Sequence, residues 1–213
     1  TFDADGEIKD YDFYEAKIES KYRLTYAEVE EAILRKKKIG STSANDSINA
    51  LKELTITLLD KRAKRNALEI ESSEPILKIN NLGEVEAINL SRRMFAHQMI
   101  EEAMIAANIC AIMFVKSSLE ISINRFHDKP DADKLLALFE KFQSFGLKRS
   151  DDPIILLQRC IEIAKRSENA TSLQSLILQG LPRAIYSSKK SGHFGLQLEE
   201  YSHFTSPIRR YPD

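Results

Sequence analysis

The sequence predicts an α+β fold that is rich in helices and carries a few, mainly antiparallel, strands. Long stretches of the chain repeat apolar residues at helical spacing and begin with capping residues. Shorter runs rich in Ile, Tyr and Phe lie beside turn sequences such as Asp5-Gly6 and Asn81-Leu82-Gly83, which favour antiparallel pairing. No internal repeat and no clean linker divides the 213 residues, so we expect one mixed unit.

The first third of the chain predicts one long strand and two helices. The run from Glu7 to Ser20 follows the Asp5-Gly6 turn and predicts the strand. A capping box over Thr25 to Glu28 predicts that the first helix begins there. Next we expect a polar loop over Ser41 to Asp46 and a second helix over Ser47 to Arg65, with apolar residues along one face.

The remaining elements follow from the same two periodicities. We expect short strands at Ala67 to Ser72, Pro75 to Asn80 and Glu84 to Asn89. A long helix from Ser91 to Ser117 is apolar around much of its circumference, which predicts a central position in the fold. After it we expect a strand at Ile121 to Phe126, helices at Ala132 to Phe145, Pro153 to Arg166 and Thr171 to Ser187 (the last kinked at Pro182), a strand at His193 to Glu199, and a polar loop from Tyr201 that enters a new helix.

Composition excludes several classes of protein. With 43% hydrophobic residues and a net charge of −1, the chain is unlike an intrinsically disordered one. Near-zero charge also argues against a nucleic-acid binder that uses its whole surface. Cys110 and Cys160 both lie in apolar helical patterns and cannot form a disulfide framework, which favours a reducing, cytoplasmic location.

No membrane partner is expected, and a monomer is the default. The longest apolar run, Ala103 to Val115, is interrupted by Asn108 and is too short to span a bilayer. The polar, acidic opening residues do not resemble a secretory signal. No exposed heptad pattern indicates a helical dimer, and the abrupt ends lead us to expect a piece of a longer protein.

The most specific stretch is the last one. Thr205 or Ser206 can cap a helix that begins at Pro207, which leaves free backbone amides beside Arg209 and Arg210. Hydroxyls, amides and guanidinium groups together suit a phosphate. Three nearby rings can stack on bases, those of His203, Phe204 and Tyr211. The residues alone leave open a plain alternative, in which the arginines of a capped helix form surface ion pairs.

These residues carry a resemblance. Gly192 to Leu196, followed by His-Phe-Thr-Ser-Pro-Ile-Arg-Arg-Tyr-Pro-Asp over residues 203–213, resembles the signature of the ribonuclease II / ribonuclease R family of exoribonucleases. Four other segments resemble the family in the same order, namely Arg23 to Tyr26, Ala67 to Ser72, Ile100 to Asn108 and Arg125 to Pro130. Within the C-terminal signature, His203-Phe204 and Arg209 to Pro212 are closer to the ribonuclease R branch than to ribonuclease II. The resemblance extends over essentially the whole chain.

The resemblance implies an RNB-type catalytic domain that hydrolyses single-stranded RNA processively from its 3′ end to nucleoside 5′-monophosphates with Mg²⁺. The family holds its metal through aspartates in a motif upstream of the region covered here, so no metal ligand is assigned in residues 1–213. The downstream end of the domain is also expected to lie outside this chain. We therefore expect the parent protein to be the enzyme and this chain alone to be inactive.

Three residues match family positions with a role in the site, and three more are expected to contact RNA. Arg209 matches the arginine that contacts the scissile phosphate and stabilises its transition state. Tyr26 matches a tyrosine that helps to discriminate RNA from DNA, and Glu101 matches the acidic residue that works with it at a ribose hydroxyl. Contacts to the RNA backbone are expected from His203, Ser206 and Arg210. Without the resemblance, Tyr26 could simply pack and Glu101 could be a solvated helix acid.

Some positions depart from the family, and other functions stay open. Ile70 stands where the family has a phenylalanine that wedges against terminal bases, which puts that stacking contact in doubt. His97 is expected to be structural, and Asp128 to cap a turn rather than to bind metal with His127. The main alternative is a catalytically dead homologue that serves as an RNA-binding scaffold. A helical protein-interaction module, with no affinity for RNA, is a third possibility.

Overall fold

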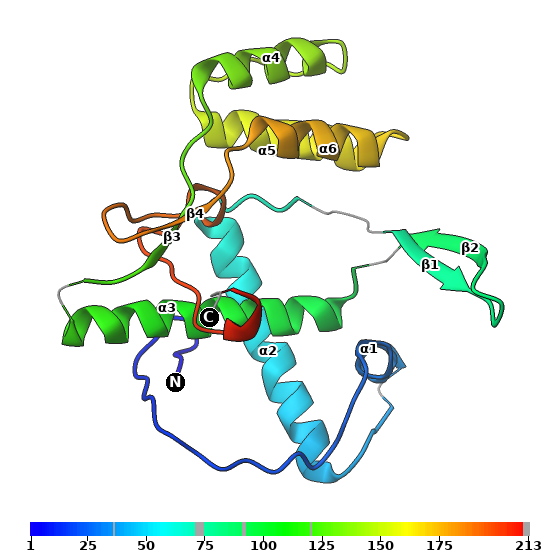
Figure 1. The fold of residues 1–213 in the computed structure, drawn as a ribbon, viewed down its shortest axis with the longest axis vertical. Helices are drawn as coiled ribbons and strands as arrows, with labels where there is room; N and C mark the ends of the chain where they lie inside the picture. Colours follow the sequence, from blue (N-terminus) through cyan, green and yellow to red (C-terminus); the bar gives the residue numbers. More distant parts are fainter. Residues whose placement is uncertain (36, 71–74, 91–92, 120, 211–213) are drawn as a thin grey trace.

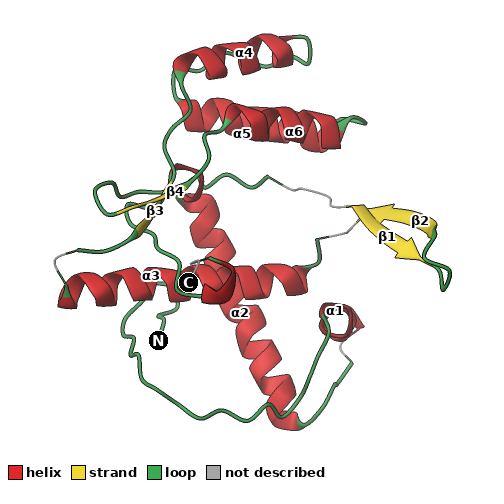
Figure 2. Ribbon diagram, viewed as in Figure 1, coloured by secondary structure: helices red, strands yellow, loops and turns green. Residues whose placement is uncertain are grey.

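A computed structural model describes residues 1–35, 37–70, 75–90, 93–119 and 121–210. Within them the α+β prediction is confirmed: six α-helices are joined by long loops and by two pairs of short antiparallel strands (Figures 1 and 2). The helices fall into two groups. One group holds the long crossing helices α2 and α3 with α1, and the other stacks α4, α5 and α6 above them in Figure 1.

Helix α1 spans Tyr26–Arg35 and α2 spans Thr42–Lys64. The predicted capping box is confirmed, since the Glu28 carboxylate accepts hydrogen bonds from the backbone N–H of Thr25, at 2.7 Å, and from its hydroxyl. The polar loop predicted before α2 is wrong. Ser41 caps the helix by accepting a hydrogen bond from the N–H of Ala44 at 3.2 Å, so its polar neighbours form the first turn instead.

The long helix α3 spans Phe95–Ser118 and crosses α2 near the centre of Figure 1, as predicted. Among the described residues, it is the one helix long and apolar enough to cross a membrane. A single such helix is weak evidence for a membrane span, because core helices of soluble proteins meet the same test. Its buried polar side chains, Glu102 and Asn108, bond to other parts of the fold. These contacts favour a core helix.

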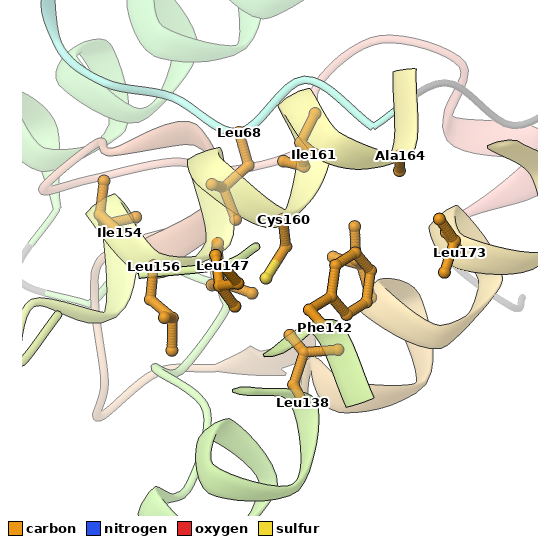
Figure 3. Close-up of a cluster of buried hydrophobic side chains, with 12 residues drawn as sticks. Leu68, Leu138, Phe142, Leu147, Ile154, Leu156, Cys160, Ile161, Ala164 and Leu173 are labelled. Atoms are coloured by element: carbon orange, nitrogen blue, oxygen red, sulfur yellow. The ribbon is translucent and has the colours of Figure 1, made fainter. Parts of the chain in front are cut away.

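Helices α4 (Ala132–Gln143), α5 (Pro153–Arg166) and α6 (Ala170–Gly180) enclose the main hydrophobic core (Figure 3). The Phe142 ring is fully buried at its centre, and the Cys160 thiol lies close by. Burial raises the pKa of Cys160 to about 12, so this thiol is inert. The cluster consists of Leu68, Leu138, Phe142, Leu147, Ile154, Leu156, Leu157, Cys160, Ile161, Ala164, Leu173 and Ile177.

The strands form two separate antiparallel pairs. Strand β1 (Pro75–Ile79) pairs with β2 (Val85–Leu90) in a hairpin that projects from the helices in Figure 1. Strand β3 (Asn124–Phe126) pairs with β4 (Ile185–Ser187), which brings the chain after α3 beside the chain after α6. The second pair matters for function because it holds one wall of the site described below.

Two strands predicted in the first third of the chain are wrong. Residues 1–3 pair with residues 7–10 only through an isolated bridge between Phe2 and Ile8 and a few hydrogen bonds. Residues 11–25 form no strand, because no second segment pairs with them to complete a ladder. The segment instead anchors through Phe13, whose ring lies 5.1 Å from that of Phe114. Residues 67–70 are also irregular, and the last two residues of that predicted strand lie outside the described part.

Three elements in the C-terminal third differ from prediction. Helix α6 ends at Gly180, before Pro182, because proline cannot donate to the helix ladder, and residues 185–187 form β4 rather than more helix. The strand predicted at 193–199 is a 3₁₀ turn, η1 (Phe194–Leu196), followed by Gln197 with φ of 51°. The helix predicted at the end is a 3₁₀ turn, η2 (Pro207–Arg209).

The molecule exposes an unusually large surface. Its accessible area is 14,976 Å², whereas a folded chain of this mass exposes roughly 10,000 Å². Large apolar side chains contribute to the excess, among them Ile18 and Leu82, each more than four-fifths exposed.

Candidate functional site

One cleft gathers four of the six residues predicted for the site. It has a volume of about 480 Å³ and lies between α3, the start of α1, strand β3 and the C-terminal segment. Tyr26, Glu101, His203 and Arg210 all line it, although 184 positions separate Tyr26 from Arg210 along the chain. The remaining two predicted residues, Arg209 and Ser206, do not line the cleft and lie on the adjoining turn.

Tyr26 stands on the first turn of α1, and its ring stacks on the imidazole of His97 with centroids 4.1 Å apart. The His97 Nδ1 accepts a hydrogen bond from the N–H of Met94 at 3.1 Å, which fixes the imidazole at the start of α3. Tyr26 is still 44% exposed. One face of the phenol therefore packs, while enough of the side chain remains accessible to stack on a ligand ring.

Glu101 is held by two arginines, so the alternative of an ordinary solvated acid is wrong. One carboxylate oxygen lies 2.9 Å from Arg62 Nη1, and the other lies 2.5 Å from Arg93 Nη2. Burial raises the pKa of Glu101, but the two guanidinium groups outweigh burial and hold that pKa below its usual value. At neutral pH the side chain is thus an oriented hydrogen-bond acceptor, as recognition of a hydroxyl requires.

The neighbouring Glu102 points the opposite way, into the protein. It is 2% exposed, and its carboxylate lies 2.6 Å from the same Arg62 guanidinium. Arg62 comes from α2 and is itself 8% exposed. One arginine therefore joins α2 to both acidic residues of α3, one at the cleft and one in the interior.

Asn108 anchors the C-terminal segment, and sequence reasoning missed it. The side chain is 1% exposed, and its Oδ1 accepts hydrogen bonds from the N–H groups of Phe204 (2.8 Å) and Thr205 (3.0 Å) and from the Thr205 hydroxyl. Its Nδ2 donates to the Tyr201 hydroxyl at 2.9 Å. The signal was present in the sequence, since a lone amide within a long apolar helix needs buried partners.

His203 and Arg210 form one contact at the cleft wall. The Arg210 Nη1 lies 2.9 Å from His203 Nε2, and the Tyr186 hydroxyl lies 2.8 Å from His203 Nδ1. Burial, together with the charges of Arg210 and Arg125, lowers the pKa of His203 to about 4. The imidazole is therefore neutral at pH 7, and the positive charge at this wall belongs to the arginines.

The Gly192 to Leu196 motif forms the floor behind this wall. His127 Nδ1 accepts a hydrogen bond from the N–H of Gly195 at 3.0 Å, and its Nε2 lies 3.0 Å from the Pro182 carbonyl. A Cβ on Gly195 would lie 3.1 Å from that imidazole, which explains the glycine. Both nitrogens of His127 are thus engaged within the protein, in agreement with the prediction that His127 and Asp128 do not form a metal pair.

No metal centre is built from the residues that the structure describes. No group of three His, Cys, Asp or Glu side chains converges there. Mg²⁺ requires several oxygen ligands in octahedral geometry. The described residues therefore do not fit the Mg²⁺ that the family resemblance implies, and no reaction step can be assigned through it.

Arg209 and Ser206 lie on the η2 turn. Ser206 has a left-handed backbone, with φ of 56°, and its side chain makes no capping bond, so the predicted helix cap is wrong. Because this turn is only three residues long, it cannot offer the dipole of a full helix. Arg209 is exposed, and its guanidinium forms no ion pair with the described residues, so the alternative in which surface ion pairs occupy both arginines is wrong for Arg209.

We expect Asn108→Leu to destabilise the fold by about 3 kcal/mol, because it leaves the Phe204 and Thr205 N–H groups without an acceptor. Urea unfolding of the full-length protein measures the loss. Asn108→Asp is the matched control, since it keeps an acceptor at the same place and should retain more of the stability than leucine does. Equal losses in the two variants would contradict the role of the Oδ1 acceptor.

Comparison with known proteins agrees with the resemblance. The RNB domain family matches residues 1–213. Ribonuclease R of Escherichia coli is 36% identical over all of this chain, which spans 27% of that relative's length. The apo form of Mycoplasma genitalium RNase R superposes with a TM-score of 0.87 at 25% identity, covering 98% of this chain and 33% of that one.

A second structure of the Mycoplasma genitalium enzyme contains ribose-methylated single-stranded RNA. It superposes with a TM-score of 0.85 at 25% identity, over 97% of this chain and 33% of that one. The match across all 213 residues, the identity to ribonuclease R and the shared fold agree with one another. This chain belongs to the RNB domain family.

Proposed function

We propose that the protein containing this chain is an exoribonuclease that hydrolyses single-stranded RNA from its 3′ end. The observation that carries the proposal is the cleft, in which Tyr26, Glu101, His203 and Arg210 converge from distant parts of an RNB domain. An aromatic ring, an oriented carboxylate and a guanidinium group are the side chains that recognise a base, a ribose hydroxyl and a phosphate.

Each residue has a separate task in the proposed reaction. Tyr26, backed by His97, stacks on a nucleotide, and Glu101 accepts a hydrogen bond from a ribose 2′-hydroxyl, which DNA lacks. Arg210, His203 and the Ser206 turn contact the RNA backbone. Arg209 binds the phosphate whose ester bond breaks and stabilises the charge that develops there.

The remaining details of the proposal follow from the family resemblance. The products are nucleoside 5′-monophosphates released processively, and the cofactor is Mg²⁺ held by aspartates outside residues 1–213. The chain, as a partial RNB domain, is inactive alone. We further propose that the protein acts as a monomer in the cytoplasm, without a membrane partner.

The full-length protein tests the proposal. Single-stranded RNA labelled at its 5′ end is incubated with it and Mg²⁺, beside DNA of the same sequence. We expect stepwise shortening of RNA from the 3′ end and little change in DNA. Tight RNA binding without shortening, at any metal concentration, would contradict the proposal and favour a catalytically dead RNA-binding scaffold.

A further inference from the structure

The cleft carries positive charge that no acidic group among the described residues balances. Three charged side chains line it, those of Glu101, Arg125 and Arg210. Glu101 is already paired with Arg62 and Arg93, which lie behind it. The two lining arginines therefore have no carboxylate partner among the described residues of the cleft, and an anion would find an unbalanced positive field there.

Arg125 is held through both its backbone and its side chain. It lies on β3, opposite Tyr186 on β4, and its N–H donates to the Tyr201 carbonyl at 2.7 Å. Its guanidinium carbon lies 4.8 Å from the centroid of the Tyr186 ring. A guanidinium held over an aromatic face keeps its N–H edges available for a second ligand.

In the described part of the chain, no carboxylate pairs with Arg125 in competition with a ligand. It forms no ion pair within the described residues, and the nearby imidazoles of His193 and His203 both have a pKa of about 4, chiefly because they are buried. Both rings are neutral at pH 7. Arg125 is therefore a half-buried cation, fixed by the backbone and by Tyr186, that faces a cleft of about 480 Å³.

We propose that Arg125 binds a phosphodiester group of the nucleic acid strand in the cleft, as a second arginine contact beside Arg210. The inference rests on the proposed function in taking RNA as the ligand. A planar guanidinium matches two phosphate oxygens with two parallel N–H donors, which a lysine cannot reproduce. The contact neutralises one phosphate, so it has a measurable signature in the salt dependence of binding.

The test measures RNA binding rather than hydrolysis. Fluorescence anisotropy of labelled single-stranded RNA is recorded with the full-length protein in EDTA, over a series of KCl concentrations. For Arg125→Gln we expect affinity to fall about tenfold at low salt, as loss of one charge-assisted contact implies. We also expect the slope of log K against log salt to become shallower by about 0.7, the value for one phosphate of a single strand.

Two further variants keep the result interpretable. Arg159→Gln removes the same charge from α5, where Arg159 bonds to the carbonyls of Lys148 and Arg149 instead of lining the cleft, and it should leave the slope unchanged. Arg125→Lys keeps the charge but not the fork, so it should keep the slope and lose part of the affinity. If Arg125→Gln disturbs folding, Arg125→Lys still tests the inference through this separation of slope from affinity.

The outcomes separate this inference from the proposed function. An unchanged slope in a folded Arg125→Gln variant, or an equal change in Arg159→Gln, would overturn the phosphate contact. A wild-type slope together with a wild-type affinity in Arg125→Lys would also overturn it, because the two parallel N–H donors of the guanidinium would then have no role. RNA that is bound with the expected slopes but never shortened would support Arg125 while overturning the exonuclease, and a protein that binds no RNA would overturn both.

Discussion

Arg209→Ala in the full-length protein is expected to slow the shortening of single-stranded RNA about 100- to 1,000-fold, the usual cost of removing one group that stabilises transition-state charge. The expectation depends on the position of Arg209, which is exposed on the η2 turn beside the cleft and has no ion-pair partner among the described residues. Rate measurements at saturating RNA detect the loss, which should fall mainly on kcat.

Because Arg209 is exposed, alanine at this position removes no packing, and an effect on activity can be separated from an effect on stability. The melting temperature should therefore stay at its wild-type value. Arg166→Ala provides the matched control, since Arg166 is an exposed arginine in the last turn of α5, away from the cleft. Wild-type kcat in Arg209→Ala, or an equal loss in Arg166→Ala, would be incompatible with a role for Arg209 at the scissile phosphate.

Arg62→Met is expected to have the largest effect on stability, a loss of about 3–5 kcal/mol in the free energy of unfolding. Glu101 keeps a second arginine, Arg93, whereas Arg62 is the one ion-pair partner of Glu102 among the described residues. With Glu102 2% exposed, the substitution leaves a buried carboxylate without its ion-pair partner. Urea unfolding followed by circular dichroism measures the change.

A double variant identifies the cause of that loss. In Arg62→Met with Glu102→Leu, neither member of the buried ion pair remains, and apolar pairs of similar volume often replace buried ion pairs at little cost. The double variant should therefore recover most of the stability that Arg62→Met loses. If it is as unstable as the single variant, packing of the arginine stem rather than its charge would be responsible.

Several predictions from sequence succeeded because the cause of the structure is local. The capping box at Thr25, the proline at the start of α5 and the turn between β1 and β2 each act over a few residues, and each prediction is confirmed. Predictions of strands were wrong more often, because a strand needs a partner segment that the local pattern does not specify. The run at 7–20 has strand-like residues, but beyond residue 10 it has no neighbour to pair with.

In the candidate site too, some residues could be predicted from the sequence and others could not. The resemblance placed Tyr26, Glu101, His203 and Arg210, which the fold brings into one cleft, although their roles remain predictions. The supporting residues stayed hidden because their contacts join distant segments: Arg62 reaches Glu102 across 40 residues, and Asn108 reaches Phe204 across 96. A pattern within one helix shows that a buried polar residue needs a partner, but it does not identify that partner.

The location of the hydrophobic core determines which part of the fold opens first. All but one of its members lie between Leu138 and Ile177, so α4, α5 and α6 are joined by contacts between near neighbours in the chain. The cleft instead depends on a few polar contacts between remote segments. Amide hydrogens around Phe204 should thus exchange with solvent through brief local opening, whereas those of α5 should exchange only when its whole helical group unfolds. The segment over residues 203–210 would then order after the group of α4, α5 and α6 and open before it.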